Sequence, residues 1–443
     1  MVKRVLPLIA IFLLSVAASG FAAEPLSLDA LLLEARANNP ELRVLTERTG
    51  AACERVPIAG SLDDPMLTLG FMNVPVDTMT FDRDPMSGKV VMLSQAFPYF
   101  GKRALKSEIA LQEARVSESD VMDKALMVES EVKSVYFGLY ATKKGIEVVA
   151  KNLSLMDDLK KAAEARYSVG KGMLKDIIKA QLEVSMLVDK RHTLEHDGRT
   201  KRAYLGSLLG RPSPVEGEVA DITVTPAKLD RDALIAQAYE TRPAVRGALA
   251  GIKKGGAMVD MARSEYYPDF TVSAQWMFKE ELKGGIDQAD MLSALVSINL
   301  PVWRRQKLDP GVRAAAYERS MAERMADSVR TDIAYKVDNY LTMIEHSDNT
   351  MKLYKDAAIP QATEDLSAAL ANYEVGGVDF MTLIESRRTL FDYELGYYEA
   401  VAEREKSVAM LEATVGLKVK DMARVDDTKA SPRIEHTGEG HDK

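Results

Sequence analysis

The stretch FTVSAQWMF at residues 270–278 decides the fold, because apolar and polar side chains alternate along it. A second stretch, MLSALVSINL at residues 291–300, repeats the alternation, and residues 65–76 and 89–98 carry a less regular version. Runs of about 10 to 12 residues suit tilted strands that cross a membrane with an apolar side toward lipid. A soluble hairpin with one buried face would give the same alternation in one pair. Two pairs in repeat register favour membrane strands.

The sequence contains two copies of one unit, as three proline-containing dipeptides at a constant offset indicate. At an offset of 203 residues the paired dipeptides are Asn39-Pro40 with Arg242-Pro243, Asp64-Pro65 with Tyr267-Pro268, and Phe97-Pro98 with Leu300-Pro301. Three more residues then enter, so that Gly170 aligns with Gly376 and Gly210 with Gly416. A period of about 200 residues is too long for a solenoid, so we infer a tandem duplication of one large unit.

Each copy has the same predicted order of helix, β-hairpin, long helix, tip and return helix. In the first repeat, residues 23–216, these elements are expected at 28–60, 65–98, 101–167, 167–172 and 173–210. In the second repeat, residues 217–425, they are expected at 229–264, 267–301, 310–373 with a kink at Pro360, 373–378 and 378–416. At 1.5 Å per residue the first long helix spans about 100 Å, which is far more than a soluble core needs.

The strands predict an oligomer, because four strands cannot close a barrel. An open sheet edge has no hydrogen-bond partner in lipid, so subunits must share one barrel. Three copies give twelve strands, which is within the range of outer-membrane barrels. We therefore predict a mainly α fold with transmembrane β-structure, in which a trimeric twelve-stranded barrel continues into a long α-helical coiled-coil barrel.

The N-terminus has the pattern of a secretory signal, which we place at residues 1–22. No later run of 18 or more apolar residues is present. The one cysteine, Cys53, excludes disulfides within the chain and cysteine-based metal sites, and a net charge of −8 argues against nucleic acid. The polar tail at 426–443 is predicted to be disordered.

In these features the chain resembles the TolC family of outer-membrane efflux proteins over nearly all of the mature sequence. The motifs that carry the resemblance are Leu26-Ser-Leu-Asp-Ala, Asn39-Pro40, Arg166-Tyr-Ser-Val-Gly170 with Asp176, Leu208-Leu-Gly210, Arg242-Pro243, Pro268, and Tyr373-Glu-Val-Gly376 through Gly416. The segment Leu93-Ser-Gln-Ala-Phe-Pro98, which runs into Gly101-Lys-Arg103, is most similar to the heavy-metal branch of CzcC-like and CusC-like channels.

The resemblance implies an exit duct in the outer membrane of a Gram-negative bacterium, with a large periplasmic part, and not an enzyme. Such a homotrimer sits in outer-membrane lipid and receives substrate from an inner-membrane pump, of the RND type, through a periplasmic adaptor. The implied substrates are heavy-metal cations, and no cofactor is implied. Drug efflux and type I protein secretion are alternatives, as is a soluble periplasmic coiled-coil adaptor.

The resemblance also assigns residues at the two tips. Its adaptor contacts correspond to Tyr167, Val169, Gly170, Lys171, Tyr373, Val375, Gly376 and Gly377. Its periplasmic gate corresponds to Glu385, Asp379, Asp176 and Thr382. A carboxylate repeated around a threefold axis would favour cations, although a solvated helix face is the alternative for Asp379 and Glu385. The family's usual Val-Gly-Leu reads Val-Gly-Lys and Val-Gly-Gly in this chain, which leaves the adaptor undetermined.

One motif favours catalysis, because HTLEH at residues 192–196 matches the H-x-x-E-H pattern of inverted zinc peptidases. On a helix, His192 and His196 would share one face. The charges around them, among them Asp189, Lys190 and Arg199, indicate a solvated column instead of a dry site, with adventitious metal binding as a further alternative. The 22 methionines are scattered at core-like positions. We therefore predict no catalytic residues and no metal site.

Overall fold

The computed structural model describes residues 26–224 and 229–418. The predicted signal peptide (1–22) and polar tail (426–443) lie outside the described residues. The helices are α1 (Leu28–Asn38), α2 (Pro40–Gly60), α3 (Lys102–Ser168), α4 (Leu174–Leu208), α5 (Arg231–Thr241), α6 (Pro243–Ser264), α7 (Asp309–Leu353), α8 (Ile359–Val375) and α9 (Phe380–Val415), with π-helical turns η1 (Arg304–Leu308) and η2 (Tyr354–Ala358). The strands are β1 (Met66–Met72), β2 (Gly88–Phe97), β3 (Phe270–Phe278) and β4 (Met291–Ile298).

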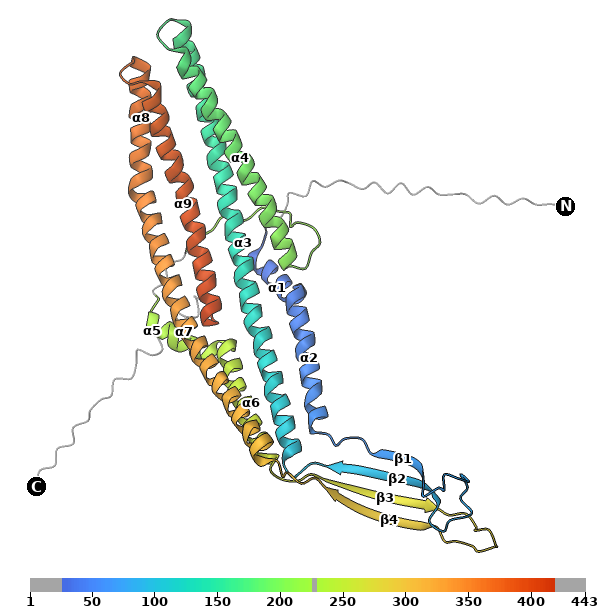
Figure 1. Cartoon of the computed structure of the whole chain (residues 1–443). Helices are drawn as coiled ribbons and strands as arrows, with labels where there is room; N and C mark the ends of the chain where they lie inside the picture. Colours follow the sequence, from blue (N-terminus) through green and yellow to red (C-terminus); the bar gives the residue numbers. More distant parts are fainter. Residues whose placement is uncertain (1–25, 225–228, 419–443) are drawn as a thin grey trace, which may run out of the picture.

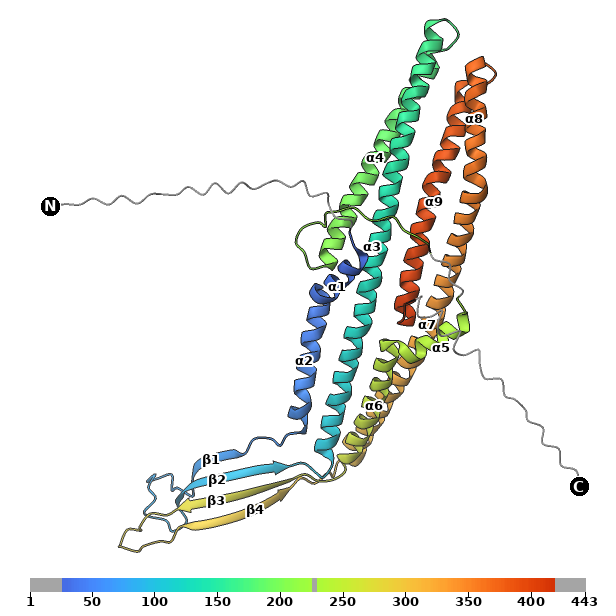
Figure 2. The same ribbon diagram turned by 180° about the vertical axis from the view of Figure 1, so that it is seen from behind.

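The chain is elongated, with a sheet at one end and the turns of two helical hairpins at the other (Figure 1). The first hairpin consists of α3 and α4, and the second of α7, η2, α8 and α9. Both views show them side by side (Figure 2), and α3 contacts α2, α4, α6 and α9. The buried side chains form three clusters along the helices, around Val132, Leu383 and Ile333. Within the ranges described, no helix combines the length and apolar character needed to cross a membrane.

Two helices expected to be continuous, over 28–60 and 229–264, are each broken at a proline. Asn39 caps α2, because its side-chain oxygen accepts a hydrogen bond from the Leu42 N–H at 3.1 Å. Its amide also donates to the Leu208 carbonyl at 2.9 Å. Pro40 follows at the first helical position, where no N–H partner is needed. The same break recurs at Arg242–Pro243 between α5 and α6, so the two repeats share it.

The long helices of the two repeats differ. In the first repeat α3 runs unbroken for 67 residues. In the second, the segment predicted as one kinked helix over 310–373 contains the π-helical turn η2 immediately before Pro360, and a further π-helical turn, η1, precedes α7. A proline lacks the N–H donor and its ring clashes with the carbonyl four residues earlier, so the helix widens at that point.

The strands form one antiparallel sheet in the order β1-β2-β3-β4, so the predicted fold class is confirmed. The register places Leu69, Val91, Trp276 and Leu292 in one row, which makes the predicted apolar face continuous across both hairpins. Leu69 and Leu292 are 69% and 70% exposed on it. The strands have 7 to 10 residues, so the predicted length agrees with β2 and was too great for β1, β3 and β4. β1 ends early because Asn73 takes a left-handed φ of 55°.

Candidate functional site at the helical tips

The two tips have the same backbone geometry. Gly170 and Gly376 both adopt left-handed φ angles, of 74° and 82°, which glycine allows at little cost. In the first tip the N–H of Lys171 donates to the carbonyl of Arg166 at 2.9 Å, and in the second the N–H of Gly377 donates to the carbonyl of Asn372 at 2.8 Å. This is the Schellman closure of a helix end, repeated by the duplication.

The tips differ in what they expose. Val169 and Val375 are 67% and 82% exposed, and Tyr167 and Lys171 are also on the surface. Tyr373, which aligns with Tyr167, is only 4% exposed and packs against Phe380 with ring centroids 5.5 Å apart. Each tip therefore exposes a valine at the equivalent position, but the ring of Tyr373 is buried.

Arg166 connects the two hairpins, and the sequence analysis did not name it as a site residue. Its guanidinium carbon lies 4.6 Å from the centroid of the Tyr373 ring, and its Nη1 donates to the Tyr373 carbonyl. Burial raises the pKa of the Tyr373 hydroxyl, and the charge of Asp176 acts in the same direction. The signal in the sequence was the Arg-Tyr pair before the first tip, which has no arginine counterpart at Asn372.

Two of the predicted gate acids cap helices. Asp379 accepts hydrogen bonds from the N–H of Thr382 at 2.9 Å and from its hydroxyl at 2.7 Å, so these two predicted residues form the N-cap of α9. The Thr382 N–H, followed by its hydroxyl, lowers the pKa of Asp379. Asp176 accepts from the N–H of Met173 at 3.4 Å in the capping box of α4. These carboxylates therefore have local structural roles.

Glu385 differs from these capping acids. It is exposed on α9, and its carboxylate has no hydrogen-bond or ion-pair partner in the described part of the chain. In the described part of the chain, no hydrogen bond or ion pair joins Glu385 to Asp176, another acid predicted at the gate. Glu385 is the predicted gate acid whose charge is free to act on solvent or on a passing ion.

Deeper in the hairpins, a buried ion pair joins α4 to α9. Glu183 lies 3.2 Å from Nη2 of Arg387 and 2.9 Å from Nη2 of Arg388, while Arg387 also donates to Asn152 of α3 at 3.2 Å. Burial lowers the pKa of Arg387, and Glu183 opposes the shift. Sequence analysis missed this network, because charged residues 204 positions apart carry no local signal of contact.

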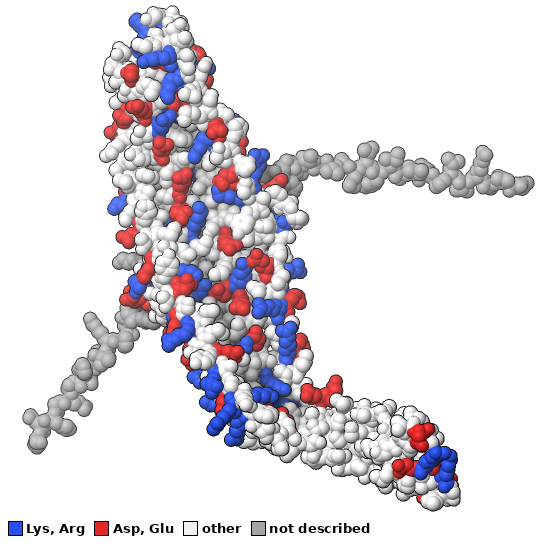
Figure 3. Space-filling model, in the orientation of Figure 1, with Lys and Arg blue, Asp and Glu red and all other residues white. Residues whose placement is uncertain are grey.

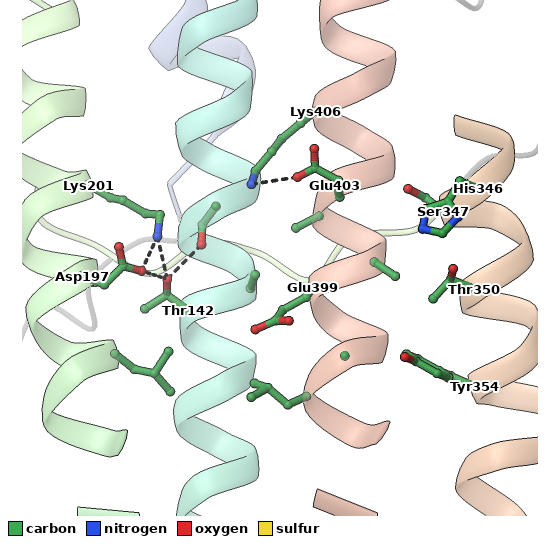
Figure 4. Close-up of a pocket in the computed structure, with 17 residues that line it drawn as sticks. Thr142, Asp197, Lys201, His346, Ser347, Thr350, Tyr354, Glu399, Glu403 and Lys406 are labelled. Carbon is green, nitrogen blue, oxygen red and sulfur yellow. Dashed lines mark hydrogen bonds and ion pairs between the residues drawn. The ribbon is translucent and has the colours of Figure 1, made fainter. Parts of the chain in front are cut away.

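A polar groove of about 510 Å³ lies between the hairpins (Figure 4). On one side Asp197 accepts a hydrogen bond from the Thr142 hydroxyl at 3.0 Å and pairs with Lys201. On the α9 side Lys406 lies 3.3 Å from Glu403. Across residues 26–224 and 229–418, no group of three or more His, Cys, Asp or Glu side chains could hold a metal ion. The groove is thus lined by mixed charges that largely pair with one another.

The HTLEH segment lies on α4. The side chain of His192 is 62% exposed, and its Nδ1 lies 3.5 Å from Glu195, whose carboxylate also lies 3.6 Å from Arg191. His196 is exposed as well. The segment belongs to a solvated helix surface, which is the reading that the surrounding charges favoured.

A four-stranded sheet with an exposed apolar face is thus joined directly to two long helical hairpins. The sequence model of the family described as "Outer membrane efflux protein" matches residues 234–417, which form most of the second repeat. Over these residues the chain is therefore similar to the outer-membrane efflux proteins, and its fold is that of outer-membrane channels with a large helical part.

Its relatives include the cobalt-zinc-cadmium resistance protein CzcC of Cupriavidus metallidurans, 21% identical over 399 residues, which cover 89% of this chain and 91% of that protein. The pyoverdine export outer membrane protein OpmQ of Pseudomonas aeruginosa is 22% identical over 405 residues, or 88% and 84% of the two chains. The solved structure of the outer membrane protein VceC from Vibrio cholerae superposes with a TM-score of 0.75 at 16% identity, over 88% and 96%. None of these descriptions names an enzyme.

Proposed function

We propose that three copies of this chain share one β-barrel and form the exit duct of a tripartite efflux system. The observation that carries this proposal is the four-stranded sheet, whose apolar face is exposed and whose edge strands, β1 and β4, lie on opposite sides. A sheet edge in lipid requires a partner strand. Pairing of β4 with β1 of the next copy supplies that partner and closes the barrel.

The tips are the proposed contact with a periplasmic adaptor, which links the duct to an inner-membrane pump of the RND type. Exposed valines at equivalent positions, Val169 and Val375, give each subunit two similar apolar contacts. Six such tips in a trimer would suit an adaptor that presents repeated helical hairpins. Lys171 in the first tip and Gly377 in the second make the two contacts chemically different.

Heavy-metal cations are the proposed substrates, with Glu385 as the acidic residue of the periplasmic constriction. CzcC is a cobalt-zinc-cadmium resistance protein, and a free carboxylate at Glu385 would favour cations when repeated around the threefold axis. Asp379, Thr382 and Asp176 are engaged in helix caps and would shape the gate, whereas Glu385 would supply its charge. OpmQ, a pyoverdine export protein, favours organic substrates as the second candidate.

Single-channel conductance in a planar bilayer tests this proposal. The wild-type trimer should give a cation-selective pore, and Glu385→Gln should reduce its preference for cations over anions. Asp379→Asn is the matched control, because it removes a charge six positions away while asparagine still caps the helix. A folded, detergent-stable trimer that forms no pore would contradict the duct, and unchanged selectivity in Glu385→Gln would contradict only the gate assignment.

A further inference from the structure

A buried lysine connects the two repeats at the end of the sheet where the chain leaves β2 and enters β3. Lys102 is 2% exposed, and its Nζ lies 2.9 Å from Asp269 and 3.3 Å from Glu265. Asp269 also accepts a hydrogen bond from the N–H of Tyr99 at 2.6 Å. A cation this buried is stable only with such partners, so the pair fixes how the end of the first hairpin meets the start of the second.

The duplication places a second cation in the equivalent position. At the repeat offset of 203 residues, Lys102 corresponds to Arg305, which follows β4 as Lys102 follows β2. The acid-bearing segment 265–269 corresponds to residues 62–66, which lead into β1 at Met66 and contain Asp63 and Asp64. The acids are shifted by one to three positions within the segment, but both segments lead directly into a strand.

Within one chain, this second set of charges is unpaired. Arg305, Asp63 and Asp64 are exposed, and none of them has an ion-pair partner in the part of the chain that is described. The neighbouring Arg304 lies 5.5 Å from the Tyr266 ring, so it has a contact of its own. Figure 3 shows Lys and Arg side chains gathered at the foot of the helices, next to the sheet.

The sheet topology separates these charges within one chain. β1 and β4 are the two edges, and each joins its helix at the same end of the sheet (Figure 1). If β4 pairs antiparallel with β1 of a second copy, the chain leaving β4 lies beside the chain entering β1, as the chain leaving β2 lies beside the chain entering β3. Arg305 would then face the next copy's segment 62–66.

We propose that Arg305 of each subunit forms an ion pair with Asp63 and Asp64 of the next subunit, at the periplasmic mouth of the barrel. This inference rests on the shared barrel proposed above and specifies one of its contacts. The partner is a second copy of this chain, because the acids and the cation are complementary and lie at the two sheet edges that must meet. The same ion pair would then recur at all six junctions of the barrel, three within subunits and three between them.

A charge swap tests this ion pair. Arg305→Glu should destabilise the detergent-solubilised trimer, seen as loss of trimer on a native gel at a lower temperature than the wild type. Adding Asp63→Lys and Asp64→Lys to Arg305→Glu should restore it. Arg199→Glu, at an exposed and unpaired arginine of α4, is the control and should leave the trimer unchanged. A swap that fails to restore the trimer would overturn the pairing.

Cross-linking gives an independent measurement in a Cys53→Ser background. Asp64→Cys with Arg305→Cys should give products of two and three chains with a short bismaleimide. Lys102→Cys with Asp269→Cys should link only within one chain. Absence of intermolecular products from a stable trimer would contradict the inference and leave the proposed duct unaffected.

A lipid-binding measurement separates a second explanation. If Arg305→Glu weakens only binding to phosphatidylglycerol vesicles, Arg305 binds lipid phosphate and the inference is wrong. A wild type that is not trimeric would instead contradict the proposed function.

Discussion

The two helical hairpins follow one duplicated plan, but only the first contains an unbroken long helix. α3 continues for 67 residues, whereas the equivalent part of the second hairpin is divided by η2 before Pro360. A π-helical turn and a proline are both places where a long helix bends. Contacts through Glu183–Arg387 and Arg166–Tyr373 join this second hairpin to the first.

The largest expected effect comes from breaking the buried ion pair. Glu183→Ala leaves Arg387 buried without its carboxylate, and loss of one partner of a buried pair costs about 3 to 5 kcal/mol. Because Arg388 is half exposed and can regain water, we expect the lower end, about 3 kcal/mol, in the free energy of unfolding of the hairpins. Denaturant unfolding of the purified protein measures it.

Two further variants sharpen this prediction. Glu183→Leu with Arg387→Met should recover much of the loss, because apolar side chains of similar volume can replace a buried pair. Asp157→Ala, which breaks the exposed pair of Asp157 with Lys161 on α3, should have little effect. Equal losses in Asp157→Ala and Glu183→Ala would show that the buried contact between the hairpins has no special weight.

A smaller effect is expected at the tips. Arg166→Ala removes a cation–π contact and a hydrogen bond to the Tyr373 carbonyl, together about 1 to 2 kcal/mol. The second tip should then separate from the first, and the distribution of distances between spin labels at Ser168 and Glu374 should broaden. Asn372→Ala, at the position equivalent to Arg166, is the control. If both variants broaden the distance distribution equally, Arg166 is not the residue that holds the second tip against the first.

The smallest effect concerns the N-cap of α9 and its pH dependence. The Thr382 N–H lowers the pKa of Asp379 below its usual 3.8, so the cap stabilises the helix end above that pH and loses its contribution as pH falls through the lowered pKa. Asp379→Ala should increase hydrogen exchange in the first turn of α9 at pH 7. This difference from the wild type should vanish in strong acid. A difference that persists there would argue against the charged cap.

The sequence predicted those features that depend on the periodic spacing of apolar residues within one element. The apolar face that includes Val272 and Trp276 followed from alternation along the strand, and the register confirmed it. The breaks at Pro40 and Pro243 could have been predicted too, because proline at a first helical position commonly starts a new helix. The Asp379–Thr382 pair has the spacing of an N-cap, so this contact too is predictable from the sequence.

By itself, the sequence determined the duplication, the strand faces and the glycine turns at the tips. These follow from repeats, periods and φ preferences, which act over a few residues or can be read by aligning the chain with itself. Only the tertiary structure decided that Arg387 is buried against Glu183, that Arg166 covers Tyr373, and that Lys102 is paired where Arg305 is not. Whether a charge is buried depends on which helices and strands surround it, and hydropathy along one segment does not contain that information.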